Sequence, residues 1–460
     1  MTRRRPRVAI VGAGPAGAYA AACLLRARGD VEIDLYERLA TPWGLLRGGV
    51  APDHQEIKRL QDRFDRETLG RGCRFLGNVE IGTDVSHSEL MRHYTAVVYA
   101  TGAQTDKSLG IPGEDLPGSW AATEFVAWYN GHPDYRDLEF DLSATRAVVI
   151  GNGNVAADVT RMLTLSPGAL ERTDIADHAL EALRESRINE VIVLGRRGPA
   201  QVAFTSAELR ELGYLEGVEI RVDPDDVELD PVSRRWLAAE GSFTARKNVE
   251  QLREFAARPA RPDAARRIEL RFLRSPVEIR GTGGVDAIDI RPNEITETDD
   301  GQLRARPLDA DVETIECGLV LRSVGYQAVP LPDVPFEERR FVLPNERGRV
   351  LTPEGEPLPG VYAVGWIKRG PTGILGTNKR DAEETVSCLA DDLRAGTLPE
   401  PSSPGRERID ALLGQRKPDV VAVEGWRAID AQELERGRSE ERPRVKLASR
   451  DELLATARQT

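Results

Sequence analysis

Two glycine-rich turns of the same type, far apart in the sequence, constrain the fold of this chain more than any other feature. Their small residues are Gly12, Gly14 and Gly17 in the first turn and Gly151, Gly153 and Ala156 in the second. Each turn follows a short β-branched run and opens a helix rich in small residues. Glycine lets the backbone approach a dinucleotide pyrophosphate, and a helix N-terminus offers N–H donors and a favourable dipole. The pair therefore predicts an α/β protein with two Rossmann-like dinucleotide-binding domains.

An acidic residue follows the predicted strand at residues 31–36. Glu37 comes about 20 residues after Gly17, the spacing at which a carboxylate accepts hydrogen bonds from a ribose. A tight glycine turn in an α/β fold without a ligand would not require an acid at that distance. The first turn is therefore interpreted as a dinucleotide site.

The strand predicted after the second turn, residues 190–194, ends in Arg196 and Arg197 instead of an acid. A carboxylate at this position would repel the 2′-phosphate of NADP, whereas arginine can pair with it bidentately. The second turn is therefore expected to bind NADP. The alternative is a solvated arginine pair at a strand end, which is common in an arginine-rich chain.

Composition limits the class of protein. The chain has 460 residues, 40% of them hydrophobic, enough for ordinary cores in several domains, and no apolar run approaches the roughly 18 residues of a membrane span. The net charge of −12 argues against a nucleic-acid-binding protein. The basic residues 1–7 run directly into a strand without a signal-peptide core, so a cytoplasmic protein is expected.

The cysteines and histidines offer no redox or metal centre of their own. None of the four cysteines forms a C-x-x-C pair, and the five histidines lack the spacing of metal ligands. We therefore expect no metal, and any redox chemistry must use a bound cofactor.

Strand and turn signals divide the chain into domains. A strand at residues 96–99 leads to Gly102, and two-dinucleotide flavoproteins often have such a segment where the chain leaves the flavin domain. Residues 319–326 repeat this pattern, which suggests that the chain returns to the first domain there. Between them, residues 179–185 read as a helical insertion and residues 215–315 as a strand-rich extension. The predicted domains are 1–102 and 326–460, which form one dinucleotide-binding domain from both chain ends with a C-terminal tail, and 103–325, which is expected to bind NADP.

Four longer motifs resemble adrenodoxin reductase and its bacterial homologues, a family of ferredoxin–NADP reductases built on the glutathione-reductase-like flavoprotein plan. The motifs are residues 44–54, 151–158, 196–199 and 365–379, and the tail residues 442–447 are also familiar from the bacterial members. The resemblance covers nearly the whole chain. It implies FAD in the domain formed by residues 1–102 and 326–460, and NADP in the domain formed by residues 103–325. It also implies electron transfer between NADPH and a separate ferredoxin or similar iron–sulfur protein, an indirect supply of electrons to a cytochrome P450, and a monomer.

The fingerprint and the resemblance together assign the cofactor-binding residues. Those on the FAD side are Gly12, Gly14, Pro15, Gly17, Glu37, Leu45, Val79, Trp366, Gly373, Ile374 and Leu375. Those on the NADP side are Asn152, Gly153, Asn154, Val155, Arg196, Arg197, Glu208 and Gly373. Some relatives carry alanine at the position of Gly17, and we expect both residues to fit there.

The resemblance places His54 and Glu211 beside the junction of nicotinamide and flavin, as the candidate catalytic residues. Taken alone, His54 reads as a loop-capping histidine and Glu211 as a solvated helix glutamate. Glu208 lies three residues before Glu211, so one helix face can present both. Glu208 is then expected to approach the arginine pair or the ribose. A charged outer helix face is the alternative for both.

Two further expectations concern residues 366–369. Trp366 is expected to pack against the flavin, or else to be an ordinary half-buried core residue. Lys368 and Arg369 are expected to be exposed cations that steer an acidic iron–sulfur partner.

Other functions fit the sequence less well. A flavin-dependent disulfide reductase would show a cysteine pair, and the NADPH-oxidising subunit of a glutamate synthase would carry a cysteine-rich N-terminal region. A flavin monooxygenase would need an added substrate domain. A non-catalytic dinucleotide-binding protein remains an alternative that the sequence leaves open.

Overall fold

The structure, a computed structural model, describes residues 5–373 and 375–459. In this part of the chain, no helix combines the length and the apolar character that crossing a membrane would require.

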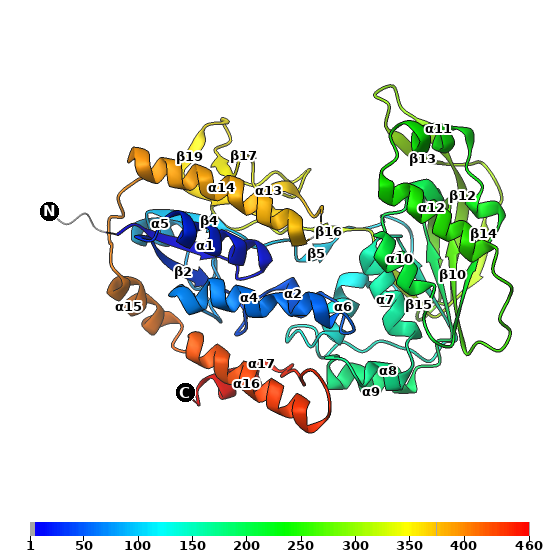
Figure 1. Ribbon diagram of the computed structural model, residues 1–460, viewed down its shortest axis with the longest axis horizontal. Coiled ribbons are helices and arrows are strands. Elements are labelled where there is room, and N and C mark those ends of the chain that lie inside the picture. The colour runs from blue at the N-terminus through cyan, green and yellow to red at the C-terminus, as the bar shows by residue number, and fades with distance from the viewer. Residues whose placement is uncertain (1–4, 374, 460) are drawn as a thin grey trace. The chain divides into compact units, whose positions relative to one another are not determined.

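The chain forms two compact units (Figure 1). Unit 1 comprises Met1–Thr105, Asn130–Arg136 and Tyr326–Thr460, and unit 2 comprises Asp106–Tyr129 and Asp137–Gly325. Unit 1 therefore contains both ends of the chain. It also contains residues 130–136, which the sequence placed in the middle domain. Asp134 holds this short segment in unit 1 by ion pairs with Arg38 and Arg450, both 2.6 Å long.

Unit 1 is built on a sheet which, in the described residues, has seven strands in the order β17-β18-β19-β4-β1-β2-β3. The parallel part runs from β19 to β3, and β17 and β18 are antiparallel. The bounds are β1 Arg7–Val11, β2 Glu32–Tyr36, β3 Arg74–Leu76, β4 Ala96–Tyr99, β17 Asn345–Glu346, β18 Arg349–Leu351 and β19 Pro357–Ala363. This arrangement confirms the strand–turn–helix–strand unit expected at residues 7–37.

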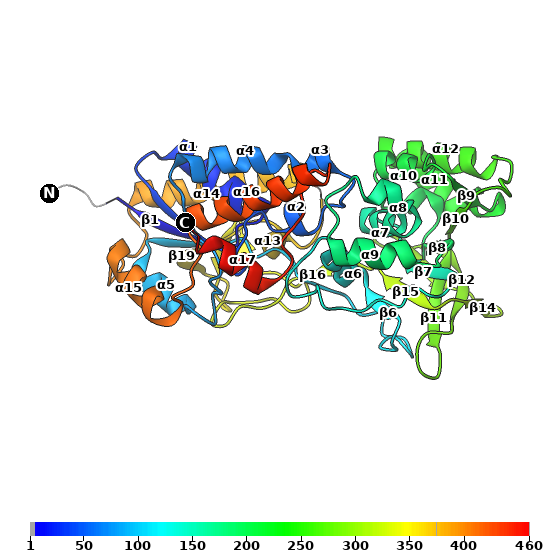
Figure 2. The same ribbon diagram turned by 90° about the horizontal axis from the view of Figure 1, so that it is seen from below.

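Helices cover both faces of this sheet, so most side chains of its central strands are apolar, and the buried Asp34 of β2 is paired with Arg7 and Arg74. Side chains alternate along β1: Val8 and Ile10 join one core, and Ala9 and Val11 join the other. The first core lies under α1 (Pro15–Ala27), α14 (Leu375–Ala395) and α16 (Val423–Ser439). Helices α1 and α14 pack side by side (Figures 1 and 2).

The remaining elements of unit 1 are short helices and the helical C-terminal tail. Their bounds are α2 Leu45–Gly48, α3 Gln55–Lys58, α4 Leu60–Glu67, η1 Leu69–Arg71, α5 His87–His93, α13 Trp366–Arg369, α15 Arg406–Arg416 and α17 Arg450–Ala457. Helices α16 and α17 pack against each other (Figure 2). The C-terminal tail is thus an integral part of unit 1.

Unit 2 contains a parallel sheet with the order β6-β15-β7-β8-β10-β9 in the described residues, and an antiparallel sheet in which β12 pairs with β11, β13 and β14. The bounds of the parallel strands are β6 Ser119–Ala121, β7 Arg146–Ile150, β8 Glu190–Leu194, β9 Val218–Val222, β10 Arg266–Arg271 and β15 Leu319–Arg322. Those of the antiparallel strands are β11 Arg274–Arg280, β12 Ala287–Glu297, β13 Leu303–Pro307 and β14 Glu313–Glu316. A short pair, β5 (Thr105–Asp106) with β16 (Tyr326–Gln327), marks where the chain passes between the units.

The helices of unit 2 differ in one respect from the expectation. The predicted insertion before β8 is present as α9, but residues 215–315 hold two helices, α11 and α12, besides strands. The bounds are α6 Ala122–Tyr129, α7 Asn154–Thr164, α8 Pro167–Leu170, α9 Asp177–Glu185, η2 Pro199–Gln201, α10 Ser206–Leu212, η3 Asp225–Val227, α11 Pro231–Ala239 and α12 Phe243–Ala256. The sequence carried their start signals: Asp230 caps α11 ahead of a first-turn proline, and Ser242 caps α12.

Candidate functional site

The carboxyl edge of the parallel strands in unit 1 gathers the residues predicted to bind FAD. In open α/β sheets, ligands bind beyond these strand ends. The backbone joins the segments that leave this edge: Gly12 N donates to Tyr36 O at 2.8 Å, and Val79 N donates to Glu37 O at 2.9 Å. Trp366 follows β19, the neighbour of β4 in the same sheet. The structure thus brings together candidates that lie more than 300 residues apart in sequence.

The first two glycines of the first turn serve different needs. Gly12 has φ +105°, and a Cβ there would lie 2.5 Å from the carbonyl oxygen of Ala100, so the fold itself requires glycine. Gly14 has φ −72°, and its Cβ would meet only Gly44, at 3.8 Å. The protein therefore leaves room at Gly14, and no side chain caps α1, which begins at Pro15. A glycine that the fold does not need, beside an uncapped helix, fits a bound pyrophosphate.

The expectation that alanine would fit equally well at Gly17 is wrong for this structure. A Cβ on Gly17 would lie 2.0 Å from the carbonyl oxygen of Gly12 and 3.3 Å from the Ala100 side chain. The turn would have to move to admit it. The second turn does accommodate a methyl group here, as buried Ala156, so the first turn is the tighter of the two.

Glu37 lies at the first turn, as its spacing predicts. Its Oε2 accepts a hydrogen bond from Ala13 N at 3.0 Å, and its Oε1 accepts one from Leu39 N at 3.1 Å. Burial raises the pKa of Glu37, and the two backbone donors oppose this shift. Because a carboxylate has about four acceptor positions, these bonds leave capacity for ribose hydroxyls.

The segment after β2 packs directly onto the first turn. Trp43 is buried and has φ +81°, and its backbone N–H donates to Ala13 O at 2.8 Å. A Cβ on Gly44 would lie 2.9 Å from Gly14 Cα, so only glycine permits this approach. Leu45 follows at once as the first residue of α2. Sequence reasoning missed Trp43, since nothing local to its sequence signals a left-handed tryptophan.

Gly365 lies against the helix that follows the first turn. A Cβ on Gly365, with φ +77°, would lie 2.5 Å from the Ala16 side chain. Trp366 is half-buried and packs on Tyr326, with 5.1 Å between ring centroids. Gly373 is exposed with φ +81°. Ile374 lies outside the described residues, and of Leu375 only the position at the start of α14 is described.

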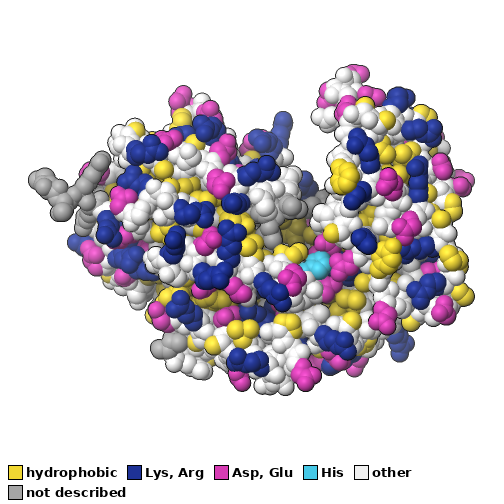
Figure 3. Space-filling model, in the orientation of Figure 1, with side chains coloured by type: hydrophobic (Ala, Val, Ile, Leu, Met, Phe, Trp, Pro, Cys, Tyr) yellow, Lys and Arg dark blue, Asp and Glu magenta, His cyan; other side chains and the backbone are white. Residues whose placement is uncertain are grey.

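Lys368 is not the exposed cation that the sequence led us to expect. Its side chain is 7% exposed, and its Nζ lies 2.8 Å from Asp381 Oδ1 and 2.7 Å from Glu384 Oε2. Arg369 is half-buried and donates to Asn378 at 2.8 Å. Lys368 therefore joins α13 to α14. On the face of unit 1 drawn in Figure 3, Lys and Arg are interspersed with Asp and Glu.

The second glycine turn repeats the same division of roles in unit 2. Gly151 has φ +128°, and a Cβ would lie 2.1 Å from Ser323 O. Gly153 has φ −103°, and its Cβ would meet only the Ala203 methyl, at 3.9 Å. No side chain caps α7, which begins at Asn154 and Val155.

A neighbouring side chain supports a ligand at this turn. Asn152 Nδ2 is buried without a hydrogen-bond partner among the described residues. Buried donors are almost always satisfied, so this amide fits a site that a dinucleotide completes.

Arg196 and Arg197 follow β8, beside the second turn. Gly151 N donates to Leu194 O at 2.8 Å, which joins the two strand ends. Arg196 is exposed and Arg197 half-buried. Burial lowers the pKa of Arg197, and the charge of Arg196 lowers it further. Within residues 5–373 and 375–459, neither guanidinium forms an ion pair, so a phosphate would relieve their repulsion.

Glu208 and Glu211 project from α10 toward a buried cation of the same unit. Arg161 on α7 is fully buried; its Nη1 donates to Glu208 at 2.8 Å and its Nη2 to Asp158 at 2.7 Å. Its Nε lies 4.0 Å from Glu211, whose side chain is 42% exposed. Glu208 is therefore held by Arg161, a partner that sequence reasoning missed. The spacing of Asp158 and Arg161, three residues apart on one helix, was the available signal.

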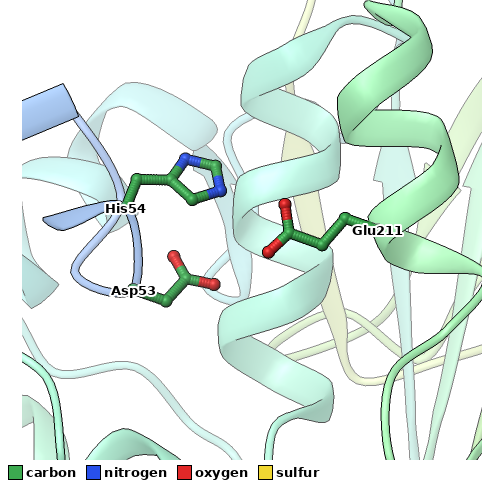
Figure 4. Close-up of side chains that lie close together, drawn as sticks. All are labelled: Asp53, His54 and Glu211. Carbon is green, nitrogen blue, oxygen red and sulfur yellow. The ribbon is translucent and has the colours of Figure 1, made fainter. Parts of the chain in front are cut away.

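His54 and Glu211 belong to different units (Figure 4). His54 follows Asp53 in the loop between α2 and α3; its N–H donates to Ala51 O at 3.0 Å, and its carbonyl accepts from Ile57 N. This backbone pattern is that of a capping residue, while both side chains carry further interactions. Their assignment to the reaction stays a prediction.

The four cysteines are free and buried. Burial raises the pKa of Cys73 and that of Cys317, each to about 12. Such thiols are protonated near neutral pH and poorly reactive. The cysteines therefore offer no internal dithiol through which electrons could pass.

Comparisons with known proteins agree with this geometry. The family model described as "Pyridine nucleotide-disulphide oxidoreductase" matches residues 6–197. NADPH-ferredoxin reductase FprA of Mycobacterium leprae is 47% identical, over 97% of both chains, and the mouse mitochondrial NADPH:adrenodoxin oxidoreductase is 43% identical, over 98% of this chain and 91% of the relative. The solved structure of Mycobacterium tuberculosis FprA in complex with NADPH is similar with a TM-score of 0.92 and 45% identity, covering 99% of this chain and all of the other.

Proposed function

Because the chain belongs to the adrenodoxin reductase-type family of ferredoxin–NADP reductases, we propose that it carries electrons between NADPH and a one-electron iron–sulfur protein by way of FAD. The observation that supports this most strongly lies in the two glycine turns. Each has at least one glycine that the fold requires and one that it does not. The glycine that the fold does not require is explained by a pyrophosphate that lies against the backbone.

The two cofactors are assigned to the two units by the residues after each turn. We assign FAD to unit 1, where Glu37 stands at the turn and Leu45, Val79 and Trp366 surround the same sheet edge. We assign NADP to unit 2, where Arg196 and Arg197 lack anionic partners in the described chain. These assignments extend the domain division expected from the sequence.

The protein's part in the reaction is to bind, orient and select. When bound, FAD exchanges electron pairs with nicotinamide and single electrons with an iron–sulfur cluster. Hydride transfer needs no protein nucleophile, so the residues act by holding the reactants in place. Arg196 and Arg197 select NADPH over NADH, while His54 and Glu211 orient the nicotinamide and the proton that accompanies transfer.

Substitution of His54 or Glu211 by alanine is expected to slow flavin reduction by NADPH about tenfold or more while FAD stays bound, because a misplaced nicotinamide loses near-attack geometry. Anaerobic stopped-flow absorbance of the flavin measures the rate, and the visible spectrum of the purified variant measures FAD content.

Exposed glutamates close in sequence to His54 and Glu211 provide matched controls. Glu56 lies on α3 beside His54, and Glu216 follows α10. Their alanine variants are expected to reduce at the wild-type rate. Wild-type rates in both His54→Ala and Glu211→Ala would remove these residues from the mechanism.

The partner is an iron–sulfur protein such as a ferredoxin, and we further propose that it connects the reductase to a cytochrome P450. We also propose a cytoplasmic monomer. Four free cysteines in the described chain agree with a reducing compartment. Multi-angle light scattering tests the oligomeric state, and a dimer mass would contradict it.

An anaerobic titration with NADPH and NADH, followed by addition of candidate ferredoxins, tests the function as a whole. We expect NADPH to bleach the yellow flavin at lower concentration than NADH, and a ferredoxin then to reoxidise it. A colourless protein, or a yellow one that NADPH does not bleach, would indicate a non-catalytic dinucleotide-binding protein instead.

A further inference from the structure

The C-terminal segment 442–447 carries three basic residues, and the cofactor sites do not account for them. Arg442, Arg444 and Lys446 are all buried, with 8%, 6% and 5% exposure. The segment folds back on α16: Arg442 N donates to Gly437 O at 2.8 Å, and Val445 N donates to Glu433 O at 3.0 Å. Buried charges are costly unless they are paired, so their partners indicate what the segment does.

The central partner is Glu433 on α16, which is fully buried. Its carboxylate accepts hydrogen bonds from Nη1 and Nη2 of Arg47, at 2.8 and 2.5 Å, and from Nη1 of Arg444 at 2.8 Å. The backbone N–H of Leu447 adds a further bond at 2.9 Å. Burial by itself would raise the pKa of Glu433, but the two guanidinium groups hold it below its ordinary value. Glu433 is therefore an anion that joins residues from the two ends of the chain.

Arg47 lies on α2, a single turn of four residues. A helix of this length is not stable by itself in water, so contacts from elsewhere must fix its position. Glu433 fixes the side chain of Arg47, and Lys446 Nζ lies 3.5 Å from the carbonyl oxygen of Arg47. Leu45 begins the same turn and follows Gly44, which packs on Gly14 of the first glycine turn.

Asn130 connects segment 442–447 to the end of α3. Asn130 Oδ1 accepts hydrogen bonds from Lys58 Nζ at 3.1 Å and from Lys446 Nζ at 3.0 Å. Lys58 is the last residue of α3, and His54 is the residue that caps the start of this short helix. Lys446 thus contacts residue 47 and, through Asn130, is linked to residue 58.

We propose that Glu433, together with segment 442–447, is a brace that positions residues 44–58 for FAD and for the nicotinamide, acting through Arg47. The proposal rests on the proposed function, since Leu45 and His54 are the braced residues that would meet the cofactors. Glu433 is a positioning residue, because it touches Arg47 and Arg444 and the cofactor contacts belong to the segment it holds.

The chain offers a matched control on the same helix. Asp430 Oδ1 accepts a hydrogen bond from the same Arg444 Nη1 at 2.8 Å, and within the described chain Arg444 is the one ion-pair partner of Asp430. Glu433→Gln and Asp430→Asn each remove one negative charge from α16, but only the first disrupts the bond to Arg47. We expect Glu433→Gln to raise the Kd for FAD about tenfold or more and Asp430→Asn to leave it within twofold of wild type.

A double-mutant cycle with Arg47→Gln separates positioning from general loss of stability. If Glu433 acts through Arg47, Glu433→Gln combined with Arg47→Gln weakens FAD binding no further than the stronger single variant. Asp430→Asn and Arg47→Gln are instead expected to combine as independent factors. FAD fluorescence on titration of apo-protein measures each Kd, at a temperature where circular dichroism shows every variant folded.

Gly437→Ala provides a second route if Glu433→Gln fails to fold. A Cβ at Gly437 would lie 2.5 Å from Arg444 Cα, so the segment must shift although every charge is kept. We expect weaker FAD binding and slower reduction by NADPH in this variant. FAD affinity unchanged in Glu433→Gln, or an equal loss in Asp430→Asn, would overturn the brace. If instead the proposed function is wrong, NADPH will not bleach the flavin of the wild-type protein, whatever the variants do.

Discussion

Replacing Arg196 and Arg197 together by alanine is expected to raise the Kd for NADPH about a hundredfold and to leave the Kd for NADH unchanged. A charge-assisted hydrogen bond contributes roughly 1.5–3 kcal/mol, and loss of about 3 kcal/mol in total corresponds to the hundredfold change. The two guanidinium groups stand beside each other at the end of β8, without an ion pair in the described chain. Since NADH lacks the 2′-phosphate, its binding does not use them.

Arg234 and Arg235 on α11 form a matched control. They are a second adjacent pair in unit 2, both exposed, and they lie on a helix instead of at a parallel strand end. Their double alanine variant removes the same charge and is expected to bind NADPH as wild type does. Isothermal titration with both nucleotides measures the effect. Equal losses for NADPH and NADH in the Arg196/Arg197 variant would argue against 2′-phosphate recognition.

Gly14→Ala is expected to give a folded protein that has lost FAD, with the Kd for FAD raised about a hundredfold. The protein leaves space for the methyl group, because the Cβ would meet only Gly44 at 3.8 Å and φ is −72°. The added methyl group would instead displace the pyrophosphate. Overpacking costs typically 1–3 kcal/mol, and the upper part of this range corresponds to the expected change. The ratio of flavin to protein absorbance measures it.

The second turn provides the reciprocal control. Gly153→Ala is expected to retain FAD and to weaken NADPH binding, since its Cβ also has room in the protein, 3.9 Å from Ala203. Gly12→Ala and Gly151→Ala are expected to destabilise their units, because each Cβ would collide with a carbonyl oxygen. A yellow Gly14→Ala variant with normal FAD affinity would show that no ligand lies against this glycine.

The most accurate sequence predictions concern features that local backbone geometry decides. The strand–turn–helix units at both glycine turns are present where predicted, because a left-handed turn leaves glycine as the suitable residue. The position of Glu37 follows equally from spacing, since neighbouring parallel strands end at one edge. The helices α11 and α12 were missed although their capping residues were visible and although Ala245, Val249, Leu252 and Phe255 recur at helical spacing in α12.

Side-chain partners were predicted less well, because they depend on how separate helices and strands pack together. Lys368 looked exposed beside Arg369, yet Asp381 and Glu384 on the following helix draw it inside unit 1. Glu208 was expected near the arginine pair or the ribose, and its ion pair with Arg161 was not foreseen; its place at the nucleotide stays a prediction.

The sequence by itself determined that this protein has two dinucleotide turns, which of them carries an acid and which an arginine pair, and to which family of reductases it belongs. These properties reside in residue types at fixed spacing along one strand–turn–helix unit. The tertiary structure alone decided which glycines the fold needs and which leave space for a ligand, and that buried Glu433 ties the C-terminal segment to Arg47. Distances of this kind arise only when chain segments tens to hundreds of residues apart pack together, and no local pattern records them.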